Sequence, residues 1–140
     1  MVRGPLSLQG EYHHVIVYES DDLNFWGYYL YGSYFLTGEN RRYNKSNGTF
    51  TRIEPKHNFR PFKGGWGAWE LGLRYSYLDL NSGGIKGGKE TNFTVGLNWY
   101  LHPKMRFMFN YIRANVEDRD DPSINDGTAD IFASRFQVVF

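Results

Sequence analysis

Three arginines lie where a strand-forming pattern places its polar side chains, and their chemistry suits anion binding. Arg74, Arg106 and Arg135 occur in stretches where every second residue is apolar. A guanidinium keeps its charge at physiological pH and offers several N–H donors, so arginines along a water-filled passage can transfer an anion between them. Glu70 precedes Arg74 by four residues on the same face of the strand, where the two could form an ion pair instead. The pattern predicts four passage-lining side chains: Glu70, Arg74, Arg106 and Arg135.

A second concentration of positive charge lies in residues 40–67, which lack this alternation. Seven basic residues stand there against Glu54 alone, in a chain whose net charge is only +1. If the segment folds toward a passage, it raises the local concentration of anions. The alternative is a solvated basic loop, or one that packs against another part of a larger protein. The basic residues are Arg41, Arg42, Lys45, Arg52, Lys56, Arg60 and Lys63.

Composition excludes several classes of function. The chain has 140 residues, which we expect to belong to one domain (1–140), and it contains no cysteine, so thiolate chemistry and disulfides are excluded. No grouping of nucleophile, base and acid is present, so the protein is not expected to be an enzyme, and no cofactor is expected. With a balanced charge and no binding motif, a nucleic-acid role is not expected either.

Carboxylates gather near the C-terminus, at Glu117, Asp118, Asp120, Asp121, Asp126 and Asp130. They could bind a divalent cation that bridges lipopolysaccharide, but their spacing is not that of a calcium-binding loop. A solvated loop is the preferred interpretation, and no metal site is predicted.

Six segments with a period of two must position these side chains: residues 6–18, 25–39, 68–80, 90–101, 105–116 and 132–140. About 9–13 residues is long for a strand of a soluble protein but suits a tilted strand that crosses a bilayer. The connection "HPK" is a short turn, whereas "SGGIKGG" and "EDRDDPSINDGTAD" are expected to be longer loops. Short turns on one side and long loops on the other are typical of an outer-membrane barrel.

The two faces of these segments favour a membrane over a soluble protein. The polar face is rich in Asn, Thr, Ser and Gly rather than in Lys and Glu, a neutral lining that suits a water-filled lumen. The apolar face carries Trp26, Trp69, Tyr77 and Trp99 near strand ends, where aromatic girdles meet lipid headgroups. The mean hydropathy of −0.57 does not contradict this, because only every second residue of such a strand faces lipid.

Several stretches resemble the C-terminal part of the phosphate-selective porin O and P family. They are "GYYLYGSYFLTGENRRY", "GGWGAWELGLRYSYLDLN", "TNFTVGLNWYLHPKMRFMFNYIRANV" and "ASRFQVVF". The resemblance implies an all-β, antiparallel, up-and-down transmembrane barrel of sixteen strands. It also implies a homotrimer in the outer membrane of a Gram-negative bacterium that passes anions such as phosphate. Six strands are too few to close such a barrel, so we expect the chain to be its C-terminal portion.

The resemblance further implies how the last strand is used. Phe132, Phe136, Val138 and Phe140 alternate up to the final residue, similar to the signal that the barrel-assembly machinery recognises on its clients. The family's orientation would place "HPK" and residues 40–67 in the periplasm, and the outer surface against lipid and lipopolysaccharide. Two other functions are kept open: a non-channel outer-membrane scaffold or binding protein, and a soluble ligand-binding β-barrel.

Overall fold

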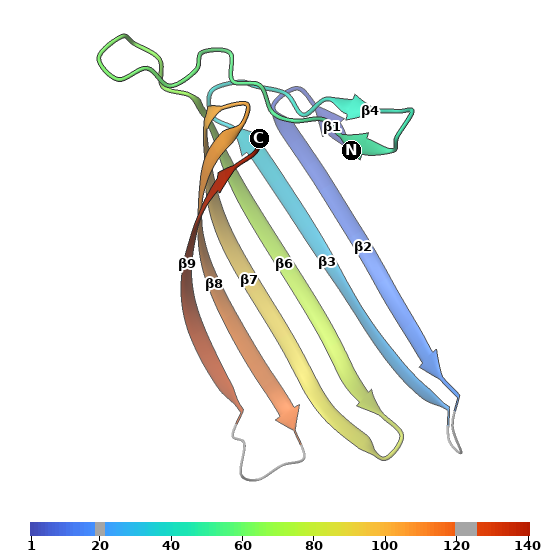
Figure 1. The fold of residues 1–140 in the computed structure, drawn as a ribbon. Coiled ribbons are helices and arrows are strands. Elements are labelled where there is room, and N and C mark those ends of the chain that lie inside the picture. Colours follow the sequence, from blue (N-terminus) through green and yellow to red (C-terminus); the bar gives the residue numbers. More distant parts are fainter. Residues whose placement is uncertain (19–21, 120–125) are drawn as a thin grey trace.

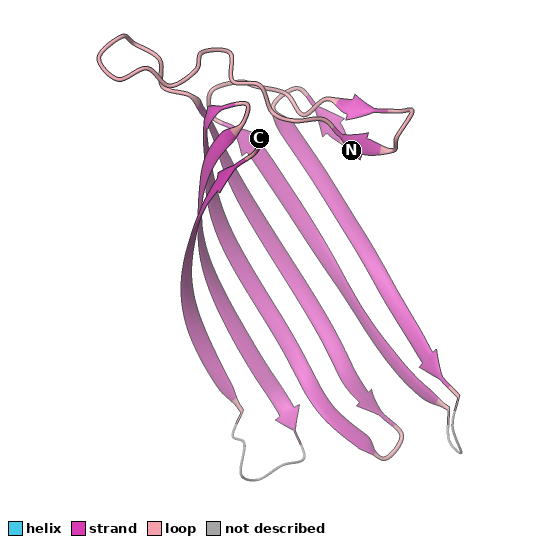
Figure 2. Ribbon diagram, viewed as in Figure 1, coloured by secondary structure: helices cyan, strands magenta, loops and turns pink. Residues whose placement is uncertain are grey.

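The computed structural model describes residues 1–18, 22–119 and 126–140, and strands make up its regular structure (Figures 1 and 2). Six strands are long: β2 (Leu6–Val17), β3 (Leu23–Phe35), β6 (Ala68–Ser82), β7 (Ile85–His102), β8 (Met105–Arg119) and β9 (Gly127–Val138). Three are short: β1 (Val2–Arg3), β4 (Tyr43–Asn44) and β5 (Thr49–Phe50). Within the described ranges, no helix is long and apolar enough to cross a membrane.

The long strands form one open antiparallel sheet in the order β1-β2-β3-β6-β7-β8-β9, so each long strand pairs with the next along the chain. The predicted all-β, up-and-down arrangement of about six long strands is therefore confirmed. β4 and β5 form a separate hairpin. Figure 1 shows the strands side by side in a curved sheet, as in part of a barrel wall.

The pairing register separates the side chains into two faces. Trp69 is opposite Trp99, which is opposite Phe107, which is opposite Phe136, and these residues define what we call the outer face. Their neighbours Glu70, Asn98, Met108 and Arg135 are aligned in the same way and define the inner face. Because side chains alternate along every strand, the aromatic residues gather on one surface and the polar residues on the other.

The connection between β6 and β7 differs from the prediction of a long loop. Ser82 pairs with Ile85, so only Gly83 and Gly84 form the turn. Gly83 has a φ of +55°, a conformation that glycine adopts without steric cost. The side-chain Oδ1 of Asn81 accepts a hydrogen bond from the N–H of Gly88 at 2.8 Å, next to an irregularity in the pairing. This bond stabilises the extended hairpin. The many glycines of this connection had predicted a loop instead.

One end of the sheet, here called the terminal end, carries both chain termini, the hairpin β4–β5 and residues 40–67 (Figure 1). The turn between β7 and β8 lies at the same end. A small apolar cluster buries Phe35, Ile53, Ala68 and Tyr100 there. Ile53 belongs to the basic segment, whereas Phe35, Ala68 and Tyr100 lie on the inner face of their strands. The cluster therefore fixes the middle of the basic segment to the sheet.

Candidate anion site on the inner face

Glu70 is fully buried on β6, next to the apolar cluster. A buried carboxylate requires compensation, and three side chains provide it. Arg41 donates to Oε1 from Nη2 at 2.6 Å and from Nε at 3.0 Å, while the Tyr100 hydroxyl and the Asn98 amide donate to Oε2 at 2.8 and 3.1 Å. The carboxylate is thus satisfied at both oxygens, and it holds Arg41 against the sheet.

This arrangement differs from the predicted pairing of Glu70 with Arg74. Arg41 belongs to the basic segment and Glu70 to β6, so the ion pair joins residues that are distant in sequence. Burial by itself lowers the pKa of Arg41, but the attraction of Glu70 and its hydrogen bonds outweigh burial, so the pKa of Arg41 is raised. Its guanidinium also lies 5.8 Å from the centre of the Phe50 ring. The start of the basic segment therefore docks on the inner face.

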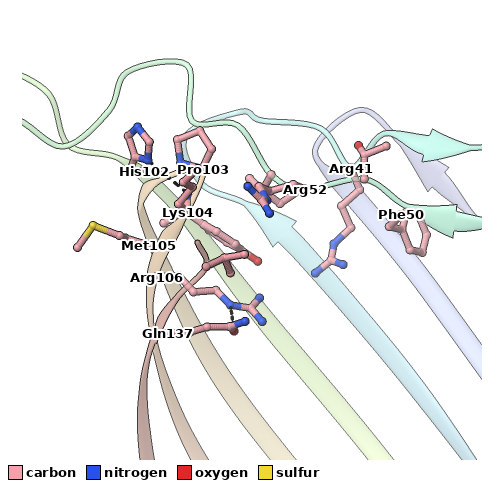
Figure 3. A pocket seen from close by; sticks show the side chains of 13 residues that line it. Arg41, Phe50, Arg52, His102, Pro103, Lys104, Met105, Arg106 and Gln137 are labelled. Atoms are coloured by element: carbon pink, nitrogen blue, oxygen red, sulfur yellow. Dashed lines mark hydrogen bonds between the residues drawn. The ribbon is translucent and has the colours of Figure 1, made fainter.

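A pocket of about 300 Å³ opens beside this ion pair, between the basic segment, the β7–β8 turn and the end of β9 (Figure 3). Four cationic side chains line it: Arg41, Arg52, Lys104 and Arg106. Arg106 donates from Nε to Oε1 of Gln137 at 2.9 Å and lies 5.8 Å from the Tyr100 ring centre. Every lining residue belongs to the described part of the chain, and none is a carboxylate.

The electrostatics of this pocket favour an anion. Arg41 is neutralised by Glu70, and within the part of the chain that the structure describes, Arg52, Lys104 and Arg106 are the lining charges without an ion pair. The partner of Arg106 is the neutral amide of Gln137, so its positive charge is retained. Guanidinium groups with spare donors bind phosphate-like oxyanions through charge-assisted hydrogen bonds.

Of the four predicted lining residues, only Arg106 lines this pocket. Glu70 is fully buried beside it instead of lining a passage, and Arg74 and Arg135 lie farther along the inner face. Arg74 is exposed and stacks its guanidinium over the Tyr29 ring at 4.6 Å. Arg135 is exposed on β9, opposite Met108 in the register. Both arginines therefore face the same side of the sheet as the pocket, although neither lines it.

The seven basic residues of segment 40–67 divide among three places. Arg41 and Arg52 line the inner-face pocket, and Arg42 and Lys45 lie at or next to the β4–β5 hairpin. Lys56, Arg60 and Lys63 line a second pocket of about 300 Å³. That pocket belongs to a loop whose Phe59 ring packs edge-on against Trp99 of the outer face, with centres 5.0 Å apart. The segment thus crosses the rim of the sheet.

Sequence reasoning missed three of the side chains that complete the inner-face site: Lys104, His102 and Gln137. Lys104 and His102 belong to "HPK", a sequence that predicts a turn and gives no sign of a binding role. Gln137 alternates with Arg135 on the polar face, and this alternation was the signal that could have found it. Asn98 and Tyr100 carried the same signal on β7. Their link to Glu70 depends on pairing across strands, which the sequence does not display.

Among the acidic residues near the C-terminus, Asp120 and Asp121 lie outside the described residues. Asp118 accepts hydrogen bonds from Lys89 at 2.8 Å and from Asn81 at 3.0 Å, and Tyr111 donates to Asp130 at 2.7 Å. Within the residues that the structure describes, no three metal-binding side chains are grouped.

Comparison with known proteins identifies the family to which this sheet belongs. The family model of the phosphate-selective porins O and P matches residues 1–140. An uncharacterized protein of Caulobacter vibrioides is 42% identical over 88 residues, which are 62% of this chain and 17% of that protein. Porin O of Pseudomonas aeruginosa is 27% identical over 150 aligned positions, covering 98% of this chain and 33% of that protein.

The chain therefore spans a third or less of the length of these curated relatives. The family consists of outer-membrane porins of Gram-negative bacteria and not of enzymes, which confirms the predicted location and class. It also removes the soluble ligand-binding barrel from the alternatives. The open antiparallel sheet, with an aromatic outer face and a polar inner face, is consistent with a fragment of a porin barrel. The chain belongs to the phosphate-selective porin O and P family.

Proposed function

We propose that this chain forms part of the wall, and one side of the periplasmic constriction, of a water-filled channel for small anions such as phosphate. The observation that carries the proposal is the inner-face pocket lined by Arg52, Lys104 and Arg106 next to the neutralised Arg41. Cationic walls of low dielectric constant concentrate anions locally, and the effect is strongest where the passage is narrow.

The buried Glu70 has a positioning role in this proposal. By binding Arg41 and accepting from Tyr100, it holds the basic segment against the inner face, so that Arg52 is presented to the pocket. Arg74 and Arg135, both exposed on the inner face, would then contact an anion farther along the passage. Successive weak contacts of this kind allow an ion to enter and also to leave.

For the full-length protein we propose a sixteen-stranded barrel that assembles as a homotrimer. Six long strands in a chain that covers 33% of Porin O agree with that total. Phospholipid and lipopolysaccharide would surround the outer face, where Leu30 and Leu73 are exposed.

Conductance of the full-length protein in a planar lipid bilayer tests the channel. With a salt gradient across the bilayer, we expect the reversal potential to show selectivity for anions over cations. We also expect added phosphate to reduce the chloride current. Replacing Arg52 and Arg106 together by Gln should lower the anion-to-cation permeability ratio several-fold while channels still open. Arg42→Gln with Lys45→Gln removes the same charge away from the pocket lining and is the matched control. A protein that inserts but stays electrically silent would instead support the non-channel scaffold.

The C-terminal strand is proposed to carry the signal for the barrel-assembly machinery. Phe132, Phe136, Val138 and Phe140 are all exposed, and Phe140 is fully so. Deleting Phe140 should lower the outer-membrane level of the full-length protein, measured by fractionation and immunoblotting. Val139→Ala is the control, because Val139 is less exposed and lies outside the predicted signal. Normal levels after the deletion would contradict this role.

A further inference from the structure

The second half of the basic segment, residues 55–66, is not used by the proposed channel, and it lies on the opposite side of the rim. Phe59 contacts Trp99 on the outer face, and its backbone N–H donates to the Leu101 carbonyl at 2.8 Å. The carbonyl of Trp66 accepts from the indole N–H groups of both Trp69 and Trp99, at 3.2 and 2.8 Å. The loop is thus fixed at Phe59 and at Trp66 to the aromatic band of the outer face.

The tip of the loop is a tight and well-defined turn. Arg60 and Gly65 form a β-bridge, and the Lys63 N–H donates to the Arg60 carbonyl at 3.2 Å. Gly65 lies so close to Asn58 that a Cβ atom would clash with its carbonyl. Phe62 has a φ of +63°, rare for an aromatic residue. The turn therefore presents the Phe62 side chain in a fixed position.

Two bulky apolar side chains of this loop have no cover. Phe62 is fully exposed and Trp66 is 74% exposed, although both lie in a loop that would otherwise be expected to be polar. Between them the loop carries Lys63, and residues 55–66 contain three basic residues and no carboxylate. The pocket lined by Lys56, His57, Arg60 and Lys63 lies in the same loop, and Trp66 lines a neighbouring pocket together with Lys56 and His57. Aromatic and cationic groups side by side suit the boundary between acyl chains and anionic headgroups.

We propose that residues 55–66 form a docking site for an anionic phospholipid of the membrane leaflet at the terminal end of the barrel. The headgroup phosphate would lie in the pocket of Lys56, Arg60 and Lys63. Phe62 and Trp66 would enter the interfacial layer, continuing the aromatic band of Trp69 and Trp99. The proposal rests on the continuity of the loop with that band and on charge complementarity. It does not depend on whether the channel conducts.

Lipid binding by the purified full-length protein tests this site. Native mass spectrometry from mixed micelles of phosphatidylglycerol and phosphatidylcholine compares the wild type with Arg60→Gln/Lys63→Gln. We expect the double variant to bind phosphatidylglycerol roughly thirtyfold more weakly, and Lys63→Gln alone roughly fivefold more weakly, since each basic group near an anionic surface contributes similarly. The matched control is Arg42→Gln/Lys45→Gln, which removes the same charge from the other half of the segment and should leave phosphatidylglycerol binding unchanged.

Two further measurements distinguish phospholipid from the other ligands or partners that could occupy this site. Inorganic phosphate at the lipid's concentration should not displace phosphatidylglycerol, because it lacks acyl chains that contact Phe62 and Trp66. A fluorescent label on Phe62→Cys, introduced into the full-length protein with any cysteine outside these 140 residues replaced, should be quenched by nitroxide-headgroup lipids, whereas a label on Asn47→Cys should not. Equal phosphatidylglycerol binding by the double variant and its control would overturn the proposal. Displacement by inorganic phosphate would overturn it as well, as would a Phe62 label that is shielded from lipid by a neighbouring protomer.

Discussion

The two halves of segment 40–67 have similar composition but opposite surroundings. Residues 41–53 carry four basic side chains and dock on the inner face through Arg41 and Ile53. Residues 55–66 carry three and dock on the outer face through Phe59. In the first half a buried carboxylate and an apolar side chain hold the backbone, whereas in the second an aromatic contact does. Charge alone therefore does not determine where each half of this segment lies. Its position is determined by the few side chains that contact the sheet.

Removing the carboxylate that holds the inner half should have the largest effect. Glu70→Gln leaves Arg41 partly buried without its counter-charge, and breaking one side of such a pair is strongly destabilising. We expect the free energy of unfolding to fall by about 3 kcal/mol. Urea unfolding of the full-length protein in lipid vesicles measures this loss. Glu54→Gln, at an exposed carboxylate between the two halves, is the control, and equal losses for both variants would mean that Glu70 does not hold the segment.

A smaller loss should follow from Tyr100→Phe, which removes one hydrogen bond to Glu70 and keeps the ring beside Phe35. Because Arg41 and Asn98 still bind the carboxylate, we expect the free energy of unfolding to fall by about 1.5 kcal/mol. The same unfolding assay applies, with Tyr34→Phe on the exposed outer face as control. No difference between the two variants would show that the hydroxyl of Tyr100 is dispensable.

The outer half should be held less firmly. Phe59→Ala removes the edge-on contact with Trp99 and should lower the free energy of unfolding in detergent by about 1 kcal/mol. Phe62→Ala, in the same loop, should have no effect in detergent because Phe62 is fully exposed. If the Phe62 variant were the more destabilised of the two, Phe62 and not Phe59 would be the residue that holds the loop on the sheet.

Charge reversal in each half should separate the two surroundings by function. Arg52→Glu introduces a carboxylate into the inner-face pocket and should lower the anion-to-cation permeability ratio by about threefold, as expected for one charge screened by water. Arg60→Glu makes the same change on the outer rim and should leave this ratio unchanged. Reversal potentials in planar bilayers compare the two variants. Similar shifts would mean that both halves face the aqueous passage.

Much of the fold could be predicted because a β-sheet encodes its faces in a period of two. The alternation of Trp69, Glu70 and Leu71 already assigns each side chain to one face, and neighbouring strands follow once they pair in order. The candidate lining residues Arg74, Arg106 and Arg135 were assigned to the inner face by this rule. The turn at Gly83 and Gly84 was not predicted, since glycines suit both a long loop and the tight turn of a hairpin.

The sequence by itself determined which side chains share a surface, because alternation is a local property of each strand. Only the tertiary structure decided which of seven similar basic residues reaches Glu70, and which lie beside Trp99 on the other side of the rim. A loop has no period that assigns its side chains to a face. Its path depends on contacts between residues far apart in sequence, such as Arg41 with Glu70 and Phe59 with Trp99, and those contacts exist only once the strands have paired.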